Sequence, residues 1–142
     1  MTTQTLSTRT IGETENALRA ILFRGLAGTG LDYPQWVALK VTAESPTPRA
    51  AGDLVALLQG GLKIDEDEAV AARDALLANG HVALTGDTVA VTASGATLFG
   101  RLDDEFATLS LQMYAGLGAD ELATAQHVLS TITERANALL AG

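Results

Sequence analysis

Cysteine is absent from this chain of 142 residues, and histidine occurs only twice. The lack of thiols excludes disulfide bonds, thiolate nucleophiles and thiolate metal sites. Neither His81 nor His127 has a second ligand at metal-binding spacing, so both are interpreted as structural and no metal site is predicted. The sequence also lacks a nucleophile elbow and a phosphate-cradling glycine motif. We therefore predict a protein that is not an enzyme and needs no cofactor.

Basic residues are scarce as well: nine Lys and Arg stand against 17 Asp and Glu, for a net charge of −8. This balance opposes non-specific attraction to nucleic acid and to anionic membranes. No apolar run is long enough to span a membrane, and residues 1–8 do not read as a signal peptide. The simplest interpretation is a soluble cytoplasmic protein. Hydrophobic residues still make up 47% of the chain, enough for a packed core.

Turn residues and caps divide the first half of the chain into helices. The first helix is predicted to begin near Thr10, which has capping-box spacing to Glu13, and to end before Gly28. Pro34 suits the first turn of a second helix, because that position needs no N–H donor. Residues 45–48, with two prolines, predict a loop.

Two more helices and a hairpin are predicted next. The third helix is expected over residues 49–59, with the two glycines at 60–61 stopping it. Asp65 can cap a fourth helix that ends at Gly80. Two β-prone runs follow, at residues 81–84 and 88–92, and a three-residue connection between them predicts a β-hairpin.

The last third of the chain is helical and has two apolar seams of heptad type. Apolar residues recur at alternating spacings of three and four, with a break at residues 116–118 and a final helix from Asp120. One small domain would not cover these seams, whereas two copies meeting through the first and last helices would. A monomer with its terminal helices packed on each other remains the alternative. The dimer is favoured, with an interface at Leu18, Leu22, Leu102, Phe106, Leu129 and Ile132.

Three stretches resemble the MarR-type transcriptional regulators, which are winged-helix homodimers that often sense small molecules. They are LDYPQWVAL at 31–39, DALLANGHV at 74–82 and VAVTASG at 89–95, and the likeness spans nearly the whole chain from Thr10. The resemblance implies a mainly α winged helix-turn-helix fold with a short hairpin wing and terminal dimerisation helices.

The same resemblance implies a domain organisation. Residues 1–9 would be a flexible N-terminus, and residues 10–142 a single MarR-like domain. Within that domain, residues 10–30 and 94–142 would form the dimerisation helices, and residues 34–92 the winged-helix unit.

The chain departs from the family where DNA would be read. Counting back from Gly80 places Glu68, Val70, Ala71 and Ala75 toward the bases, and none can donate the paired hydrogen bonds that Arg, Asn or Gln make. The wing, at residues 85–87, has no cation. Between residues 45 and 92 there are three basic and seven acidic residues, which gives a net charge of −4. The basic residues are Arg49, Lys63 and Arg73; the acidic ones are Asp53, Asp65, Glu66, Asp67, Glu68, Asp74 and Asp87.

The site predictions follow from these residues, each with a plainer interpretation beside it. Arg49, Lys63 and Arg73 are the candidates for contacts to DNA phosphates, although they are equally explained as ordinary surface charge. The acids at 65–68 are best explained as helix-capping and dipole-complementing residues. A pocket for a small effector would be lined by Phe23, Trp36 and Tyr114, unless these aromatics are plain core.

The leading hypothesis is a MarR-like transcriptional regulator that binds double-stranded DNA as a homodimer and responds to a small molecule. The alternative is a degenerate winged-helix dimer that has lost DNA binding and docks a protein partner through its acidic face. A third hypothesis is a binder of small molecules that uses only the pocket.

Overall fold

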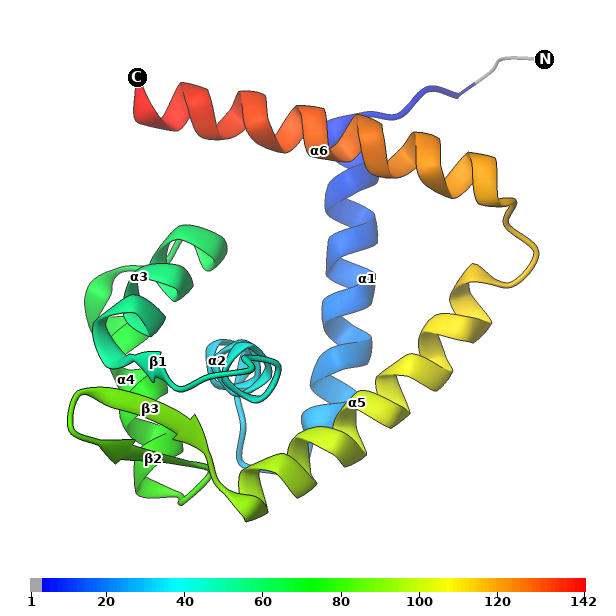
Figure 1. The fold of residues 1–142 in the computed structure, drawn as a ribbon. Helices are drawn as coiled ribbons and strands as arrows, with labels where there is room; N and C mark the ends of the chain where they lie inside the picture. The colour runs from blue at the N-terminus through cyan, green and yellow to red at the C-terminus, as the bar shows by residue number, and fades with distance from the viewer. Residues whose placement is uncertain (1–3) are drawn as a thin grey trace. The chain divides into compact units, whose positions relative to one another are not determined.

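The computed structural model describes residues 4–142 and confirms a mainly α winged helix-turn-helix fold with a small antiparallel sheet (Figure 1). It divides into two compact units, one ending at Phe106 and the other comprising Ala107–Gly142. In the described part of the chain, each helix is too short or too polar to cross a membrane. The elements are α1 (Thr8–Leu26), α2 (Tyr33–Ala43), β1 (Arg49–Ala50), α3 (Ala51–Leu62), α4 (Glu66–Ala78), β2 (Val82–Thr85), β3 (Thr88–Val91), α5 (Ala93–Tyr114) and α6 (Ala119–Ala141).

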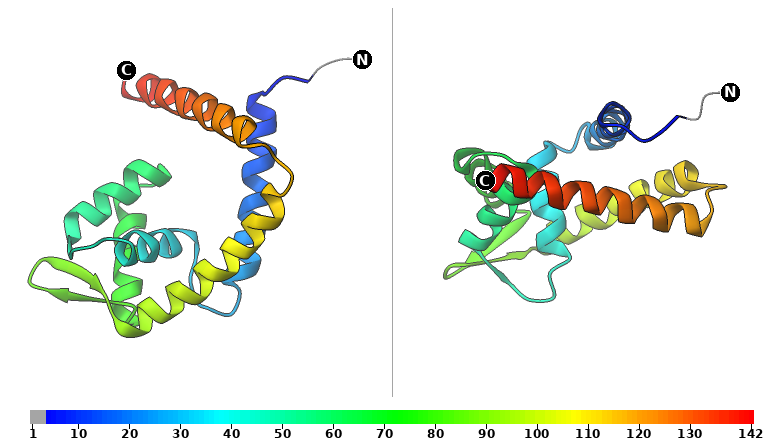
Figure 2. Two further views of the ribbon diagram at one scale, coloured as in Figure 1. Left: turned by 45° about the vertical axis from the view of Figure 1, so that its right-hand side comes forward. Right: turned by 90° about the horizontal axis from the view of Figure 1, so that it is seen from above.

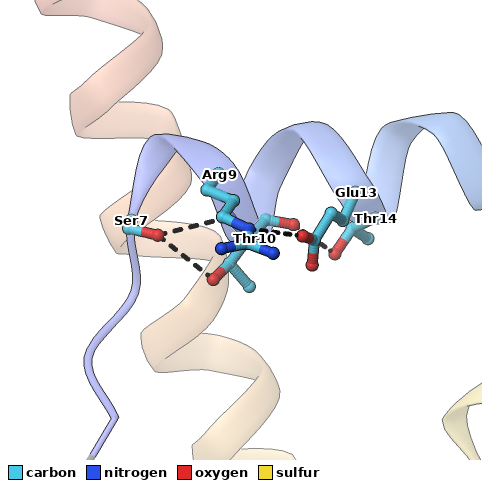
Figure 3. A network of polar contacts seen from close by, with 5 residues as sticks. All are labelled: Ser7, Arg9, Thr10, Glu13 and Thr14. Carbon is cyan, nitrogen blue, oxygen red and sulfur yellow. Dashed lines mark hydrogen bonds and ion pairs between the residues drawn. The ribbon is translucent and has the colours of Figure 1, made fainter.

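Helix α1 begins earlier than the sequence predicted, because a different residue caps it. The Ser7 hydroxyl accepts the N–H of Thr10 at 3.3 Å, so the helix starts at Thr8 (Figure 3). Glu13 does not close a capping box on Thr10; it accepts a hydrogen bond from Arg9 Nε at 2.7 Å. The predicted capping role of Thr10 was therefore wrong. The spacing of Ser7 and Thr10 provides an equally good cap one turn earlier.

Residues Arg49 and Ala50 form a strand, β1, and not the first turn of a helix as predicted. Arg49 pairs with Val89 and Ala50 with Thr88, and the N–H of Ala51 donates to the carbonyl of Asp87 at 2.8 Å. The sheet order is β1-β3-β2, with β3 in the centre. The partner of β1 lies about 40 residues along the chain, so local sequence could not reveal it.

The two glycines predicted to stop α3 lie inside it. The helix continues to Leu62 and ends at Lys63, which adopts a left-handed conformation with φ of 58°. Its backbone N–H donates to Gln59 and its Nζ donates to the carbonyl of Gly60 at 2.7 Å. Each glycine weakens a helix by about 1 kcal/mol relative to alanine, but α3 buries Leu54, Val55 and Leu58. Their packing outweighs the poor propensity of residues 60–61.

Helix α4 follows its prediction closely. The Asp65 carboxylate accepts the N–H of Glu68 at 2.8 Å, and the helix ends at Ala78 before Gly80, which has φ of 75°. Three further acids in the first turn lie at the positive end of the helix dipole, which stabilises the helix start. The charges that make this helix unusual for DNA contact thus have a local structural reason.

The wing is a tight hairpin that projects from the helices of its unit (Figure 2). Thr85 pairs directly with Thr88, so the connection has two residues and not the predicted three. Gly86 occupies the first of them with φ of 62°, a conformation that two-residue hairpin turns require and glycine adopts without strain. The wing is therefore short as well as free of cations.

The core of the first unit lies between α2, α3, α4 and the sheet. Trp36 on α2 is only 6% exposed; its ring stacks on Phe99 at 5.8 Å and meets the edge of Phe106 at 5.3 Å. Leu102 of α5 is completely buried. Because Trp36, Phe99, Leu102 and Phe106 pack together in this core, they attach the start of α5 to the winged-helix elements.

The junction into α5 is built around one glycine. The Thr92 hydroxyl accepts the N–H of Gly95 at 3.1 Å and donates to the carbonyl of Gly80 at 2.6 Å. The N–H of Thr92 donates to the carbonyl of His81 at 3.1 Å. A methyl group on Gly95 would lie 1.9 Å from that same carbonyl oxygen. Only glycine fits here, which gives a physical reason for the spacing of Thr92 and Gly95 within the VAVTASG stretch at 89–95.

The second unit contains the end of α5 and all of α6. The Glu121 side chain accepts the N–H of Gly118 at 2.9 Å, which fixes the start of α6. No residue of α6 is buried. The apolar residues Leu122, Leu129 and Ile132 on this helix are more than a third exposed. In the single chain, therefore, the apolar seam of α6 is uncovered.

Candidate nucleic-acid interface

The face of α4 that points away from the core carries no hydrogen-bond donor side chain. Its buried residues are Ala69, Ala72 and Leu76. On the opposite side, a line of exposed residues recurs at spacings of four, three and four, as a helix requires for one face. We call this line the outer face of α4; it consists of Asp67, Ala71, Asp74 and Ala78.

The positions that the sequence placed toward the bases are only partly on this face. Glu68 and Ala71 are exposed, whereas Val70 and Ala75 are half-buried, and Val70 packs against the core. A carboxylate can only accept hydrogen bonds, and alanine can do neither. The helix thus offers acceptors and methyl groups where base edges are usually read by donors.

The three candidate phosphate-binding cations lie on three different elements. Arg73 on α4 is 23% exposed, and its Nε donates to Asp74 at 3.1 Å. Lys63 caps α3 and donates to the carbonyl of Gly60. Arg49 lies in β1, and its Nε is buried without a hydrogen-bond partner among the described residues. Two of the three therefore have a local contact, Arg73 through one of its five N–H donors and Lys63 through one of its three.

The wing offers apolar rather than basic groups. Leu84 of β2 is 49% exposed. The loop after it contains Gly86 and Asp87, and Asp87 is exposed. The absence of a basic wing residue, predicted from the sequence, is thus accompanied by an exposed leucine.

A hollow of about 190 Å³ lies along α1 and the start of α2. It is lined by Glu15, Leu18, Arg19, Leu22 and Tyr33. Arg19 pairs with Glu15 at 2.5 Å, and its guanidinium carbon lies 5.1 Å from the centre of the Tyr33 ring. The hollow therefore combines two leucines, an aromatic face and an ion pair.

None of the aromatics predicted to line a pocket lines this hollow. Trp36 is part of the core, whereas Phe23 and Tyr114 are half exposed. Tyr33 was missed, although it stands beside Trp36 in the 31–39 stretch that carries the family resemblance. The sequence signal that could have identified Tyr33 was its position just before Pro34, at the first turn of α2.

The residues predicted for a dimer interface have different surroundings in the single chain. Leu18, Leu129 and Ile132 are about 40% exposed. Leu22 and Phe106 are partly buried and pack against the core. Leu102 has no exposed surface in the single chain. It lies on the same seam, but the core of its own chain covers it.

Lys40 joins α2 to α5 and was not foreseen. Its Nζ lies 2.6 Å from Glu44 and 3.7 Å from Asp103. The hydrogen bond to Glu44 raises the pKa of Lys40; partial burial opposes the rise, and the Asp103 charge adds to it. The raised pKa of Lys40 stabilises the fold at every pH below the ordinary pKa of lysine. This contribution to stability is lost only as the pH rises through the shifted pKa. The link is therefore constant near neutral pH.

The sequence matches no protein-family model. It also matches no curated protein. Among solved structures, it is similar to the transcriptional regulator PA3341, with a TM-score of 0.74 and 21% identity over 91% of this chain and 96% of that one. The MarR family protein Rv2887 of Mycobacterium tuberculosis, solved in complex with DNA, gives a TM-score of 0.68 at 18% identity, covering 91% of this chain and 98% of that one.

A third similar structure is CouR from Rhodococcus jostii RHA1, which was solved bound to p-coumaroyl-CoA. Its TM-score is 0.70 at 16% identity, and the match covers 86% of this chain and 87% of that one. These similarities show that the chain has the winged-helix fold of the MarR-type regulators.

Proposed function

We propose that this chain is a transcriptional regulator that works as a homodimer. The observation that carries the proposal is the winged helix-turn-helix fold, which the chain shares over nearly its whole length with transcriptional regulators. Helix α4 stands in the place of a recognition helix, between α3 and the wing. The uncovered seam of α6 supports the dimer.

Contact with duplex DNA is proposed to be weak and to depend on Arg49, Lys63 and Arg73. Arg49→Glu and Arg73→Glu should each lower the affinity for duplex from around the gene and reduce its salt dependence by about one unit of logarithmic slope per subunit. Fluorescence anisotropy at low and near-physiological salt measures both quantities.

Arg135→Glu is the matched control, since it makes the same charge change on α6, outside the winged-helix unit. All variants are first checked for folding by circular dichroism. Equal DNA affinity in wild type, Arg49→Glu and Arg73→Glu would remove these residues from the interface. An equal loss in Arg135→Glu would point to net charge alone.

The dimer is proposed to form through the exposed Leu18 of α1, the exposed end of α5 and the apolar seam of α6. Replacing Leu129 by glutamate places an unpaired carboxylate in that interface twice, once per subunit. Because an unpaired buried charge costs about 3–5 kcal/mol, Leu129→Glu should be monomeric at micromolar concentration by light scattering. Wild type should have the mass of a dimer.

His127→Glu provides the control for this variant. His127 is exposed on α6 two residues before Leu129 and is not part of the apolar seam. It should leave the dimer intact. A monomeric wild type, or dissociation of both variants alike, would contradict the proposed interface.

A response to a small effector is proposed as a further part of this function. The α1 hollow supports it, because a cavity of about 150 Å³ can hold a single aromatic ring. CouR, of similar fold, was solved with p-coumaroyl-CoA bound. For this chain the proposal rests on Arg19, Tyr33 and the two leucines that line the hollow.

A further inference from the structure

We infer that the outer face of α4 is a docking surface for a basic helical segment of another protein. This goes beyond the proposed contact with DNA. A partner bound there would cover the helix that otherwise faces the duplex, so protein and DNA would compete for it. The inference concerns the outer face of α4, together with two exposed leucines of the same unit, Leu57 and Leu84.

The spacing of this face suits a second helix. Asp67 and Asp74 are two turns apart, about 10 Å along the axis at 1.5 Å per residue. Lysine or arginine residues seven positions apart on a partner helix have the same separation. Between and beyond the acids are Ala71 and Ala78, whose short side chains allow a partner helix to approach closely.

The charge of the face favours a cationic partner over phosphate. Asp74 remains 57% exposed even though one of its oxygens accepts from Arg73, so it can accept further hydrogen bonds. Glu66 and Glu68 are exposed beside Asp67. The winged-helix region from residue 45 to residue 92 has a net charge of −4. Complementary charge of this kind accelerates association and selects partners.

Exposed apolar groups indicate a protein rather than a simple cation. Leu57 of α3 is 36% exposed and Leu84 of β2 is 49% exposed. Both belong to the winged-helix elements that flank α4. A protein partner can bury leucine side chains, which favours binding in proportion to the apolar area removed from water. Phosphate groups and metal ions cannot.

The test uses the full-length protein and a labelled helical peptide of about 20 residues, long enough to form a helix. Lysine recurs at every seventh position of this peptide, with alanine and leucine on the same face; a scrambled peptide has the same composition. Wild type should bind the patterned peptide about tenfold more tightly than the scrambled one. The double variant Asp67→Asn/Asp74→Asn should lose about tenfold in affinity for the patterned peptide.

Glu105→Gln/Glu134→Gln makes the same change in net charge on α5 and α6, at exposed positions outside the winged-helix unit. Its affinity should stay within about twofold of wild type. Ala71→Gln changes no charge and only adds a larger side chain to the outer face. It should lower the affinity for the patterned peptide about fivefold. This third variant still tests the surface if loss of the Asp67 charge destabilises α4.

Three results would overturn the inference: equal binding of both peptides, equal weakening in the two double variants, or no saturable binding at low salt. The first two would show general attraction of cations to an acidic protein. Duplex DNA is measured in parallel as a competitor. DNA binding that persists while the peptide fails to bind would reject the docking surface and leave the proposed regulator function standing.

Discussion

Gly95→Ala is expected to destabilise the fold by about 3 kcal/mol or more, at the upper end of what overpacking a core costs. The added methyl group would lie 1.9 Å from the carbonyl oxygen of His81, 2.8 Å from its carbon and 3.0 Å from Val91. Backbone must move to relieve the first two contacts. That carbonyl also accepts a hydrogen bond from the backbone N–H of Thr92, whose hydroxyl oxygen lies 3.1 Å from it. A shift would therefore disturb both the wing and the start of α5.

Denaturant unfolding measures this effect, followed by the fluorescence of Trp36, the only tryptophan in the chain. Gly100→Ala is the matched control in the same helix, since a methyl group there would meet no atom within 4 Å. It should be neutral or stabilising by up to about 1 kcal/mol. Similar midpoints for the two variants would contradict the close approach of α5 to His81.

Asp67→Arg/Asp74→Arg should raise affinity for duplex DNA about 100-fold at low salt. Each substitution changes the outer face of α4 by two charge units, and a dimer presents the pair twice. The change also frees Arg73 from Asp74. Every additional phosphate neutralised steepens the salt dependence by about 0.9 logarithmic units, so the slope should increase by two or more. Anisotropy titrations at several salt concentrations give both the affinity and the slope.

The control Glu105→Arg/Glu134→Arg adds the same charge outside the winged-helix unit. General electrostatic attraction should increase the affinity of this control for duplex DNA by less, within about tenfold. If both pairs increased the affinity and the slope equally, α4 would not be the helix that faces DNA. The same Arg variant should fail to bind the patterned lysine peptide, because the charge of the docking surface is reversed.

Local signals predicted those parts of the fold that local interactions stabilise. Asp65 and Gly80 bound α4 because a carboxylate satisfies the free N–H of Glu68 and a glycine adopts the left-handed conformation after the helix. Asp32 and Pro34 start α2 for related reasons. Such contacts join residues only a few positions apart, so their pattern is visible without the tertiary structure.

Predictions failed where a distant partner decides the conformation, and also where two local signals compete. Arg49 is in a strand because its backbone pairs with that of Val89. Gly60 stays helical because the buried leucines of its helix hold it there. Ser7 caps α1 and Thr10 does not, because two equivalent local signals cannot be ranked from sequence alone. These errors lie at element boundaries, where small energies compete.

The same difference between local signals and distant contacts applies to the predicted site. The acids of α4 and the lack of donors at the four positions predicted to face the bases were visible in the sequence, and the structure places Asp67 and Asp74 on the outer face of α4. Which apolar residues are core was not visible. Leu102 and Leu129 occupy equivalent positions in their seams, yet one is completely buried and the other is 41% exposed. Periodicity identifies an apolar face but not what covers it.

The sequence by itself determined the absence of thiol chemistry, the excess of acidic charge and the order of helices and hairpin, since these depend on composition and on short-range caps and turns. The tertiary structure alone decided that β1 completes the sheet, that Gly95 lies against the carbonyl of His81, and that Trp36 and Leu102 belong to the core. Those features arise from contacts between residues far apart in the chain. Their energies become available only when the elements pack together.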